Sequence, residues 1–202
     1  MLAQVLAGFQ AAGVVPQLSL FDRCATPIKL NQWFAERHGQ TIEATVSDAA
    51  SYASDAAFDV VCTHCFLGYF TKDERPALFA KWNALLRPGG YVVTVNPIRN
   101  VDNDDFVGFG EQQAAAFAAR ALAAAKDNPE ACSGRTDELA RRVRAFTDNF
   151  GSYPVRSVAE FRGLFEDAGF AVEECENLTD GSGSGGPTEK SLIYQSAVAR
   201  RL

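Results

Sequence analysis

Asp22, Asp48 and His64 each lie at, or shortly after, the end of a run that is typical of a buried strand. A carboxylate offers two acceptor oxygens and no donor, so Asp22 and Asp48 could both receive hydrogen bonds from a ligand. A neutral imidazole can take up a proton near physiological pH, which makes His64 the candidate general base. These residue types indicate a site that binds a polar ligand and moves a proton.

Cys62 and Cys65 flank His64 in a C-x-x-C arrangement, which is typical of a dithiol redox pair or of half a zinc site. Zinc usually takes a second ligand pair at comparable spacing, and the sequence has none. If a strand continues through Cys62, the two sulfurs leave on opposite faces. Redox or metal chemistry is therefore a secondary hypothesis, and no metal site is expected. Five cysteines without a secretion signal indicate reduced thiols.

Strand-like runs alternate with helical patterns over most of the chain, which predicts a mainly parallel sheet covered by helices. The last two strands should be antiparallel neighbours, because no helix separates them. Ligands bind such sheets at the carboxyl ends of the strands, where Asp22, Asp48 and His64 are expected. The expected strands are residues 18–21, 41–46, 58–62, 91–95, 170–178 and 192–199.

Capping residues, prolines and glycines mark the expected helix ends. A helix over residues 1–12 stops at Gly13, and Thr26 caps a helix whose first residue is Pro27. The third helix begins near Asp73, with Pro76 in its first turn, and the sequence Arg87-Pro88-Gly89-Gly90 then turns the chain into a strand. Ser157 and Glu160 form a capping box for the last helix. A glycine-rich stretch, residues 180–186, should be a flexible connection.

Residues 97–156 interrupt the alternation and predict a helical lid inserted into one domain that spans residues 1–202. Residues 111–126 are alanine-rich and helical in pattern, and a second helix carries apolar residues on one face. These are Leu139, Val143, Phe146 and Phe150.

The order of these elements resembles that of the class I S-adenosylmethionine-dependent methyltransferases. The segments that carry the resemblance are Phe21-Asp22, Ser47-Asp48-Ala49, Phe58-Asp59-Val60-Val61, Ala168-Gly169-Phe170 and, most specifically, Leu85-Leu86-Arg87-Pro88-Gly89-Gly90 with the strand after it. The resemblance implies a Rossmann-like three-layer α/β sandwich with a mostly parallel sheet and an antiparallel C-terminal strand. It also implies methyl transfer from S-adenosylmethionine to a small-molecule acceptor.

The resemblance assigns roles to particular positions. Asp22, with Arg23 beside it, matches the acidic residue that accepts hydrogen bonds from the ribose hydroxyls. Asp48 and the backbone N–H of Ala49 match the residues that contact the adenine. Cys62 and Thr63 lie where the chain passes the methionine part of the cofactor, and His64 is the expected catalytic base. Asp22 could instead only end a strand or cap a local turn, Asp48 could be a solvated loop residue, and His64 could be a hydrogen-bonded residue without a chemical role.

The sequence departs from the family pattern before Asp22, where the glycine-rich turn that follows the family's first strand is missing. The helix at residues 1–12 matches the helix after that turn, so we expect a truncated chain that binds the cofactor weakly. If the chain is not truncated, either the two strands that flank the missing first strand pair with each other, or another segment takes the position of that strand in the sheet. An open gap would leave two rows of backbone groups unpaired.

Two other functions stay open. A noncatalytic methyltransferase-like binding module would explain the missing turn, and an NAD-dependent oxidoreductase shares the alternating architecture but lacks a G-x-G-x-x-G turn here. Nineteen basic against 25 acidic residues give a net charge of −6, which disfavours nucleic acid and anionic membranes as partners. No apolar run has the length of a membrane span, so a cytoplasmic protein is expected. The acceptor atom and the oligomeric state stay open.

Overall fold

The computed structural model describes residues 1–55, 57–132, 135–178 and 192–202, so the expected connection at residues 180–186 lies outside the described residues. The helices are α1 (Leu2–Ala11), α2 (Ala25–Arg37), the 3-10 turn η1 (Leu67–Tyr69), α3 (Arg75–Leu85), α4 (Glu111–Asp127), α5 (Pro129–Cys132), α6 (Thr136–Asn149) and α7 (Val158–Asp167). The strands are β1 (Leu18–Asp22), β2 (Ile42–Val46), β3 (Phe58–His64), β4 (Leu86–Arg99), β5 (Val107–Gly108), β6 (Gly151–Ser152), β7 (Phe170–Leu178) and β8 (Leu192–Arg201).

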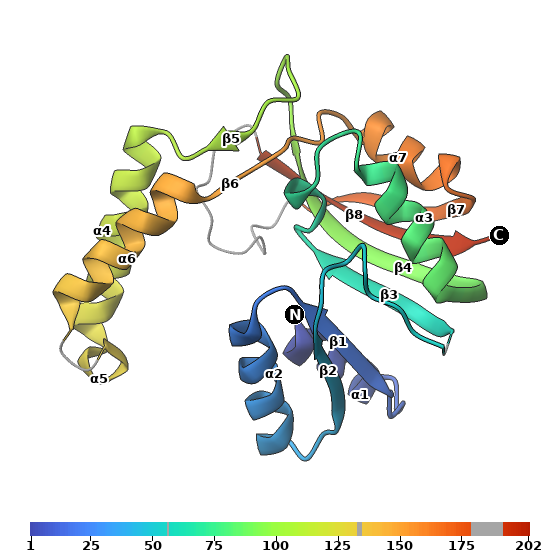
Figure 1. Ribbon diagram of the computed structural model, residues 1–202, viewed down its shortest axis with the longest axis horizontal. Coiled ribbons are helices and arrows are strands. Elements are labelled where there is room, and N and C mark those ends of the chain that lie inside the picture. Colours follow the sequence, from blue (N-terminus) through green and yellow to red (C-terminus); the bar gives the residue numbers. More distant parts are fainter. Residues whose placement is uncertain (56, 133–134, 179–191) are drawn as a thin grey trace.

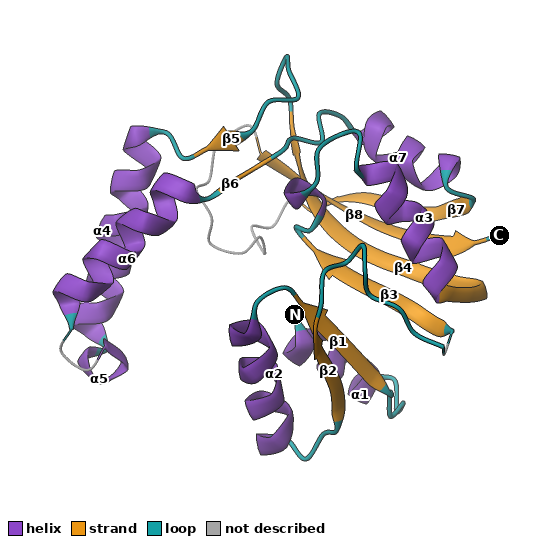
Figure 2. Ribbon diagram, in the orientation of Figure 1, coloured by secondary structure: helices purple, strands orange, loops and turns teal. Residues whose placement is uncertain are grey.

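The main sheet has four strands in the order β3-β4-β8-β7 (Figure 2). β3 and β4 are parallel, whereas β8 is antiparallel to both of its neighbours. β1 and β2 form a separate parallel pair, in register from Leu18 opposite Ile42 to Asp22 opposite Val46. The predicted Rossmann-like α/β fold is confirmed, and so is the antiparallel pairing of the last two strands.

The sheet is divided, because no ladder joins β1 to β3 among the described residues. The two strands have therefore not closed up. Side-chain packing connects the two sheets instead: Ala49, in the loop after β2, is buried in the core of the four-stranded sheet, and Phe21 of β1 packs against that core. The ring of Phe21 also stacks on Tyr52, with centroids 4.3 Å apart.

One face of the four-stranded sheet is covered by α3 and α7 (Figure 1). Alternate residues of the strands point to this face, as the two-residue period of a strand requires, and Val92 and Ala199 are fully buried there. Phe79 of α3 meets Phe165 of α7 edge to face, with centroids 4.7 Å apart. Burial of such side chains stabilises the fold by about 1.5–3 kcal/mol each.

Arg75 is a cation without any exposed surface, at the start of α3. It donates hydrogen bonds to Glu160 Oε1 at 2.9 Å and to the carbonyl oxygens of Tyr153 and Pro154 at 3.0 and 2.8 Å. Burial lowers the pKa of Arg75, and the charges of Glu160 and Asp104 oppose that shift. The side chain therefore joins α3, the segment before α7 and α7 itself.

The predicted turn at Arg87-Pro88-Gly89-Gly90 lies within the first residues of β4, which begins at Leu86, and two glycines shape it. Gly89 has a φ of +77°, and a Cβ on Gly90 would lie 3.0 Å from the carbonyl oxygen of Asp59. β4 is longer than the predicted strand 91–95, because its ladder with β8 continues as far as Arg99.

Three other predicted boundaries need correction. β3 extends to His64 rather than ending at Cys62, because its ladder with β4 continues to His64 opposite Val95. α2 begins at Ala25 with Cys24 as its N-cap residue, so Thr26 lies inside the helix. α3 begins at Arg75, two residues later than expected.

Residues between β4 and α7 form a projecting helical arm, in which α4 packs along α6 and the short ribbon β5–β6 connects the pair to the sheet (Figure 1). Four phenylalanine rings hold its base together, and Phe146 stacks on Phe117 and Phe150 with centroids 5.4 and 4.7 Å apart. The predicted helices are present, whereas a lid function over a bound acceptor stays a prediction. No described helix combines the length and the apolar composition that a membrane span requires.

Candidate functional site

The carboxyl ends of β1 and β2 bring Asp22 and Asp48 to one rim. The backbone N–H of Ser47 donates to the carbonyl oxygen of Asp22 at 3.0 Å, which ties the two loops together. Arg23 Nε lies 3.2 Å from Asp48 Oδ2, so the residue after one acidic side chain is paired with the other. The rim is open to solvent, since 44% of the Asp48 side chain and 83% of the Arg23 side chain are exposed.

Both acidic side chains also cap their own turns. Asp22 Oδ1 accepts from the N–H of Cys24 at 2.7 Å, and Asp48 Oδ1 accepts from the N–H of Ala50 at 2.9 Å. A carboxylate has acceptor capacity on both oxygens, so a turn bond at one of them leaves the other available. The turn bonds fix the direction of each carboxylate and leave Asp22 Oδ2 without a hydrogen bond or ion pair to the described residues.

Ala49 and Tyr52 line the same loop. The Ala49 side chain is buried in the core, which holds its backbone beside Asp48. Tyr52 stacks on Phe21 and so places an aromatic ring next to the acidic rim. The sequence gives no signal for Tyr52, because its contact with Phe21 depends on how the loop folds back over β1.

Cys62, Thr63 and His64, which the sequence predicts to lie at one site, do not all point to the same face of β3. Cys62 and His64 share one face of the strand, whereas Thr63 points to the other face, where its Oγ1 lies 2.7 Å from Thr94 Oγ1. Thr63 is thus part of a hydrogen-bond network beneath the rim. Its side chain does not lie with those of Cys62 and His64.

His64 has the charge state that a general base needs. Burial, and then the positive amino group of Met1, lowers the pKa of His64, so the imidazole is neutral at pH 7. The effect of Met1 also shows that the start of α1 lies near His64. Burial raises the pKa of Cys62, so this residue is a thiol and a weak nucleophile.

Cys65 follows β3 with a φ of +52°, a left-handed conformation that is uncommon for a residue other than glycine. Cys24, Cys62, Cys65 and Cys175 form no disulfide bond with one another. Among the described residues, no group of three or more histidine, cysteine or acidic side chains is placed to hold a metal ion.

Tyr69 belongs to the turn η1, which follows β3. Burial of its phenol, followed by negative charge on Cys65 and Asp22, raises the pKa of Tyr69, although 61% of the residue is exposed. Asp22 therefore acts across the boundary between the two sheets. Tyr69 precedes no recognisable motif, so its position near Asp22 could not be derived from the sequence.

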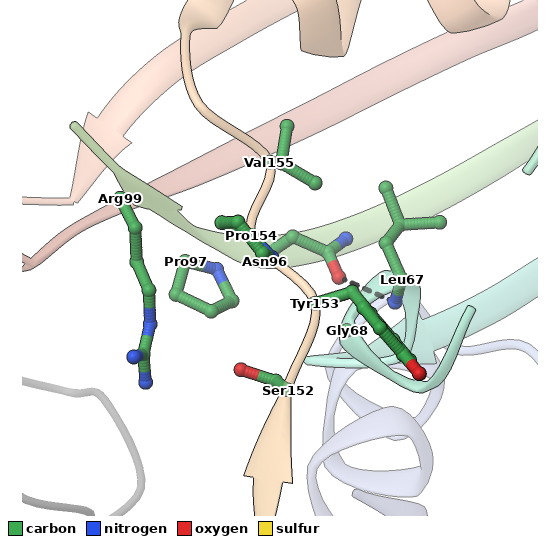
Figure 3. Close-up of a pocket in the computed structure, with 9 residues that line it drawn as sticks. All are labelled: Leu67, Gly68, Asn96, Pro97, Arg99, Ser152, Tyr153, Pro154 and Val155. Carbon is green, nitrogen blue, oxygen red and sulfur yellow. Dashed lines mark hydrogen bonds between the residues drawn. The ribbon is translucent and has the colours of Figure 1, made fainter. Parts of the chain in front are cut away.

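Two cavities lie away from this rim. One of about 10 Å³ has room for about one water molecule and lies where η1 meets Asn96 and the segment before α7 (Figure 3). The other is an open groove of about 740 Å³ in the arm, bounded by phenylalanine rings and by four alanines of α4 and α6. The residues expected at the cofactor thus lie on an open rim, and the large groove is part of the helical insertion.

Residues 4–94 match the family model of a methyltransferase domain. No curated protein matches the chain in sequence. The family match ends within β4, so it covers the elements that carry Asp22, Asp48 and His64 and excludes the arm.

Solved structures share the fold of the whole chain at low sequence identity. The [4+2]-cyclase SpnF is 12% identical, with a TM-score of 0.60, and the match covers 96% of this chain and 69% of that protein. A S-adenosylmethionine-dependent methyltransferase from Methanosarcina mazei is 17% identical, with a TM-score of 0.56 and coverages of 92% and 82%. The 1,6-didemethyltoxoflavin-N1-methyltransferase of Burkholderia thailandensis, solved with 1,6-didemethyltoxoflavin and S-adenosylhomocysteine, is 15% identical, with a TM-score of 0.58 and coverages of 97% and 65%.

The family match over residues 4–94 and the fold shared with S-adenosylmethionine-dependent methyltransferases confirm the resemblance expected from the sequence. S-adenosylmethionine is the cofactor of this class. The rim suits the adenosine half of that cofactor, because its two carboxylates accept hydrogen bonds and its donors are few. The start of α1 and the end of β3 are the described segments that could contact the methionine half.

Proposed function

We propose that this chain binds S-adenosylmethionine across the rim formed by Asp22, Asp48 and His64, and that it transfers the methyl group to a small-molecule acceptor. The relationship that supports this proposal is the convergence of Asp22 and Asp48 at the ends of β1 and β2, with an unused oxygen on Asp22. Ligand binding at the carboxyl ends of parallel strands is the general rule for such folds.

Each residue has a distinct part in the proposed mechanism. When bound, S-adenosylmethionine supplies an electrophilic methyl group on a sulfonium. Asp22 would accept hydrogen bonds from the ribose hydroxyls, while Asp48, held by Arg23, and the Ala49 N–H would contact the adenine. Cys62 would line the passage to the methionine part. Thr63 would support the rim from the other face of β3, because its hydroxyl is hydrogen-bonded to that of Thr94.

His64 would act on the acceptor. Its lowered pKa keeps the imidazole neutral at pH 7, so it can take the proton that a hydroxyl or ammonium acceptor must lose. The rest of catalysis in this proposal is positioning, since methyl transfer requires an in-line approach of acceptor and methyl group.

We propose that the arm covers the acceptor, and the aromatic rings of the arm suit an acceptor with apolar surface. The acceptor itself must lie at the rim, within reach of His64 and of the methyl group, so it would not occupy the groove of about 740 Å³, which lies away from the rim. The similar Burkholderia thailandensis structure holds 1,6-didemethyltoxoflavin, which supports a small molecule rather than a macromolecule as the acceptor class.

Thermal unfolding with saturating S-adenosylmethionine, S-adenosylhomocysteine or NAD tests the proposal. A ligand that binds only the folded state at 100 times its Kd stabilises it by about 2.7 kcal/mol. We expect stabilisation by the first two ligands and none by NAD. Stabilisation by NAD alone would make the oxidoreductase the better account, and no response to any ligand would favour the noncatalytic module.

A further inference from the structure

Arg99 ends β4 and lies on the same face of the sheet as His64. The ladder between β3 and β4 places Val95 opposite His64, and side chains two residues apart on a strand share a face, so the Arg99 side chain points the same way as these two. The residues on either side of Pro97, Asn96 and Ile98, are buried on the face that carries α3 and α7. Arg99 therefore lies on the His64 side of the sheet, about 13 Å further along β4 than the position opposite His64.

The guanidinium of Arg99 is left without an acceptor by the residues that the structure describes. Its Nε is buried and makes no hydrogen bond, and no described acidic side chain forms an ion pair with it. The loop that follows β4 does contain acidic residues, but Asp104 lies 2.9 Å from Arg156 Nε and 3.5 Å from Lys72 Nζ. A buried N–H without an acceptor destabilises a protein, and an oxygen atom of a bound ligand would satisfy it.

Ser152 brings a second unpaired donor to the same place. Arg99 and Ser152 both line the small cavity between η1, β4 and the segment that precedes α7 (Figure 3). The Ser152 hydroxyl points toward the side on which the Arg99 guanidinium lies, and it forms no hydrogen bond with another described residue. The cavity has room for about one water molecule, so it admits an oxygen atom of a ligand and not a whole ligand.

Backbone contacts hold both residues in place. The Arg99 N–H donates to the carbonyl oxygen of Val155 at 2.9 Å, which joins the end of β4 to the segment that returns from the arm. In the same segment, the N–H of Tyr153 donates to the carbonyl oxygen of Gly68 at 2.8 Å. Because these contacts do not involve the guanidinium or the Ser152 hydroxyl, both groups stay available to a ligand at positions that are fixed before it binds.

We infer that Arg99, with the Ser152 hydroxyl beside it, binds a carboxylate group of the methyl acceptor. A guanidinium donates from Nε and Nη to the two oxygens of a carboxylate in one plane, so this ligand would satisfy the buried Nε. The net charge of −6 favours a singly charged carboxylate over a doubly charged phosphate. The inference rests on the proposed function and narrows its acceptor to small molecules with a carboxylate. That group is the one bound and not the one methylated, because Arg99 lies about 13 Å along β4 from the position opposite His64.

Benzoate is the probe for this site, because it joins a carboxylate to a small aromatic ring. Benzamide has nearly the same shape without the charge, and phenyl phosphate carries the doubly charged group. Arg99→Gln removes the cation, Arg99→Lys keeps the charge but loses the planar pair of donors, and Ser152→Ala removes the second donor without changing Arg99. Arg87→Gln is the matched control, because Arg87 lies at the opposite end of the same strand and its ion pair with Asp59 is exposed.

The measurement is an NMR titration of the ¹⁵N-labelled chain with each probe. Benzoate should move the signals of Arg99 and Ser152 in the wild type, and its Kd should be the same in R87Q. R99Q should weaken benzoate binding by about tenfold or more, the range for a hydrogen bond to a charged group, while R99K and S152A should weaken it less. Benzamide should bind at least tenfold more weakly than benzoate.

Several results would overturn the inference. These are a wild type that does not bind benzoate, an R99Q that binds it as tightly as the wild type, and equal binding of benzamide and benzoate. Tighter binding of phenyl phosphate than of benzoate would overturn the choice of a carboxylate. If R99Q does not fold, R99K and S152A decide the question, and wild-type affinity in both contradicts the site.

Calorimetry with S-adenosylhomocysteine separates this inference from the proposed function. We expect the wild type and R99Q to bind S-adenosylhomocysteine with the same Kd, because Arg99 is assigned to the acceptor and not to the cofactor. A wild type that binds benzoate at Arg99 but not S-adenosylhomocysteine contradicts the proposed function and leaves the carboxylate site standing. A wild type that binds S-adenosylhomocysteine but not benzoate contradicts the carboxylate site alone.

Discussion

Arg23 Nε lies 3.2 Å from Asp48 Oδ2, and this ion pair links the loop after β1 to the loop after β2. Both side chains are well exposed, so water screens their attraction and its contribution to folding is small. The ion pair matters because it fixes the direction of the Asp48 carboxylate. The guanidinium holds one oxygen of the carboxylate while the N–H of Ala50 holds the other.

Arg23→Gln should therefore have little effect on stability and a modest effect on ligand binding. An exposed pair contributes about 0.2–1 kcal/mol, which corresponds to a loss of about fivefold at most in affinity for S-adenosylhomocysteine. Urea unfolding and calorimetry measure the two quantities. A loss of affinity of a hundredfold would mean that Arg23 contacts the ligand itself.

Arg75→Met should destabilise the protein strongly. The change leaves Glu160 and two backbone carbonyl oxygens without their buried donor, and loss of one partner of a buried pair costs about 3–5 kcal/mol. Urea unfolding gives the difference in free energy. Arg162→Met on α7 is the control, because its pair with Glu166 is exposed and should matter by less than about 1 kcal/mol. Equal effects of the two substitutions would contradict the structural role of Arg75.

His64 should make the protein less stable in mild acid. Its pKa is lower in the folded state than its unfolded value of about 6.5, so the unfolded state binds more protons below that pH. Stability is then complete above pH 6.5 and falls as the pH drops through that value. The unfolding free energy of His64→Gln should decline less steeply between pH 7.5 and 5.5 than that of the wild type. Parallel curves would show that His64 is protonated as easily in the fold as in the open chain, and His38→Gln controls for loss of a histidine elsewhere.

The arm should open independently of the sheet. α4 and α6 pack on each other, and the Phe117 ring lies among Phe109 and Phe146. Phe117→Ala should lower hydrogen-exchange protection in α4 and α6 and leave protection in β4 and β8 unchanged. Exchange measured by mass spectrometry distinguishes the segments. Loss of protection in β4 as well would mean that arm and sheet unfold as one unit.

Local sequence signals predicted the elements that depend on neighbouring residues. Ser157 caps α7 by accepting from the Glu160 N–H at 3.0 Å, and Gly89 shapes the turn at the start of β4, both as expected. The carboxylate of Glu160 accepts from the N–H of Arg156 at 2.9 Å and also binds Arg75, 85 residues away in the sequence. No local pattern contains such a contact.

The same limit applies to the site: the positions of its residues at strand ends followed from the sequence, whereas its packing contacts did not. Strand order placed Asp22 and Asp48 at one rim, since parallel strands end at the same edge. The division of the sheet, the stacking of Tyr52 on Phe21 and the position of Tyr69 near Asp22 depend on packing between distant segments. Period and spacing carry no information about these contacts.

The most direct test of the account is the affinity of S-adenosylhomocysteine for the wild type and for Asp22→Asn, measured by calorimetry. A hydrogen bond to a charged group contributes about 1.5–3 kcal/mol, so the neutral amide should weaken binding by about 10- to 150-fold. Asp167→Asn, an exposed change at the end of α7, should leave the Kd unaltered. Binding by D22N that is as tight as binding by the wild type would contradict the assignment of Asp22 to the cofactor.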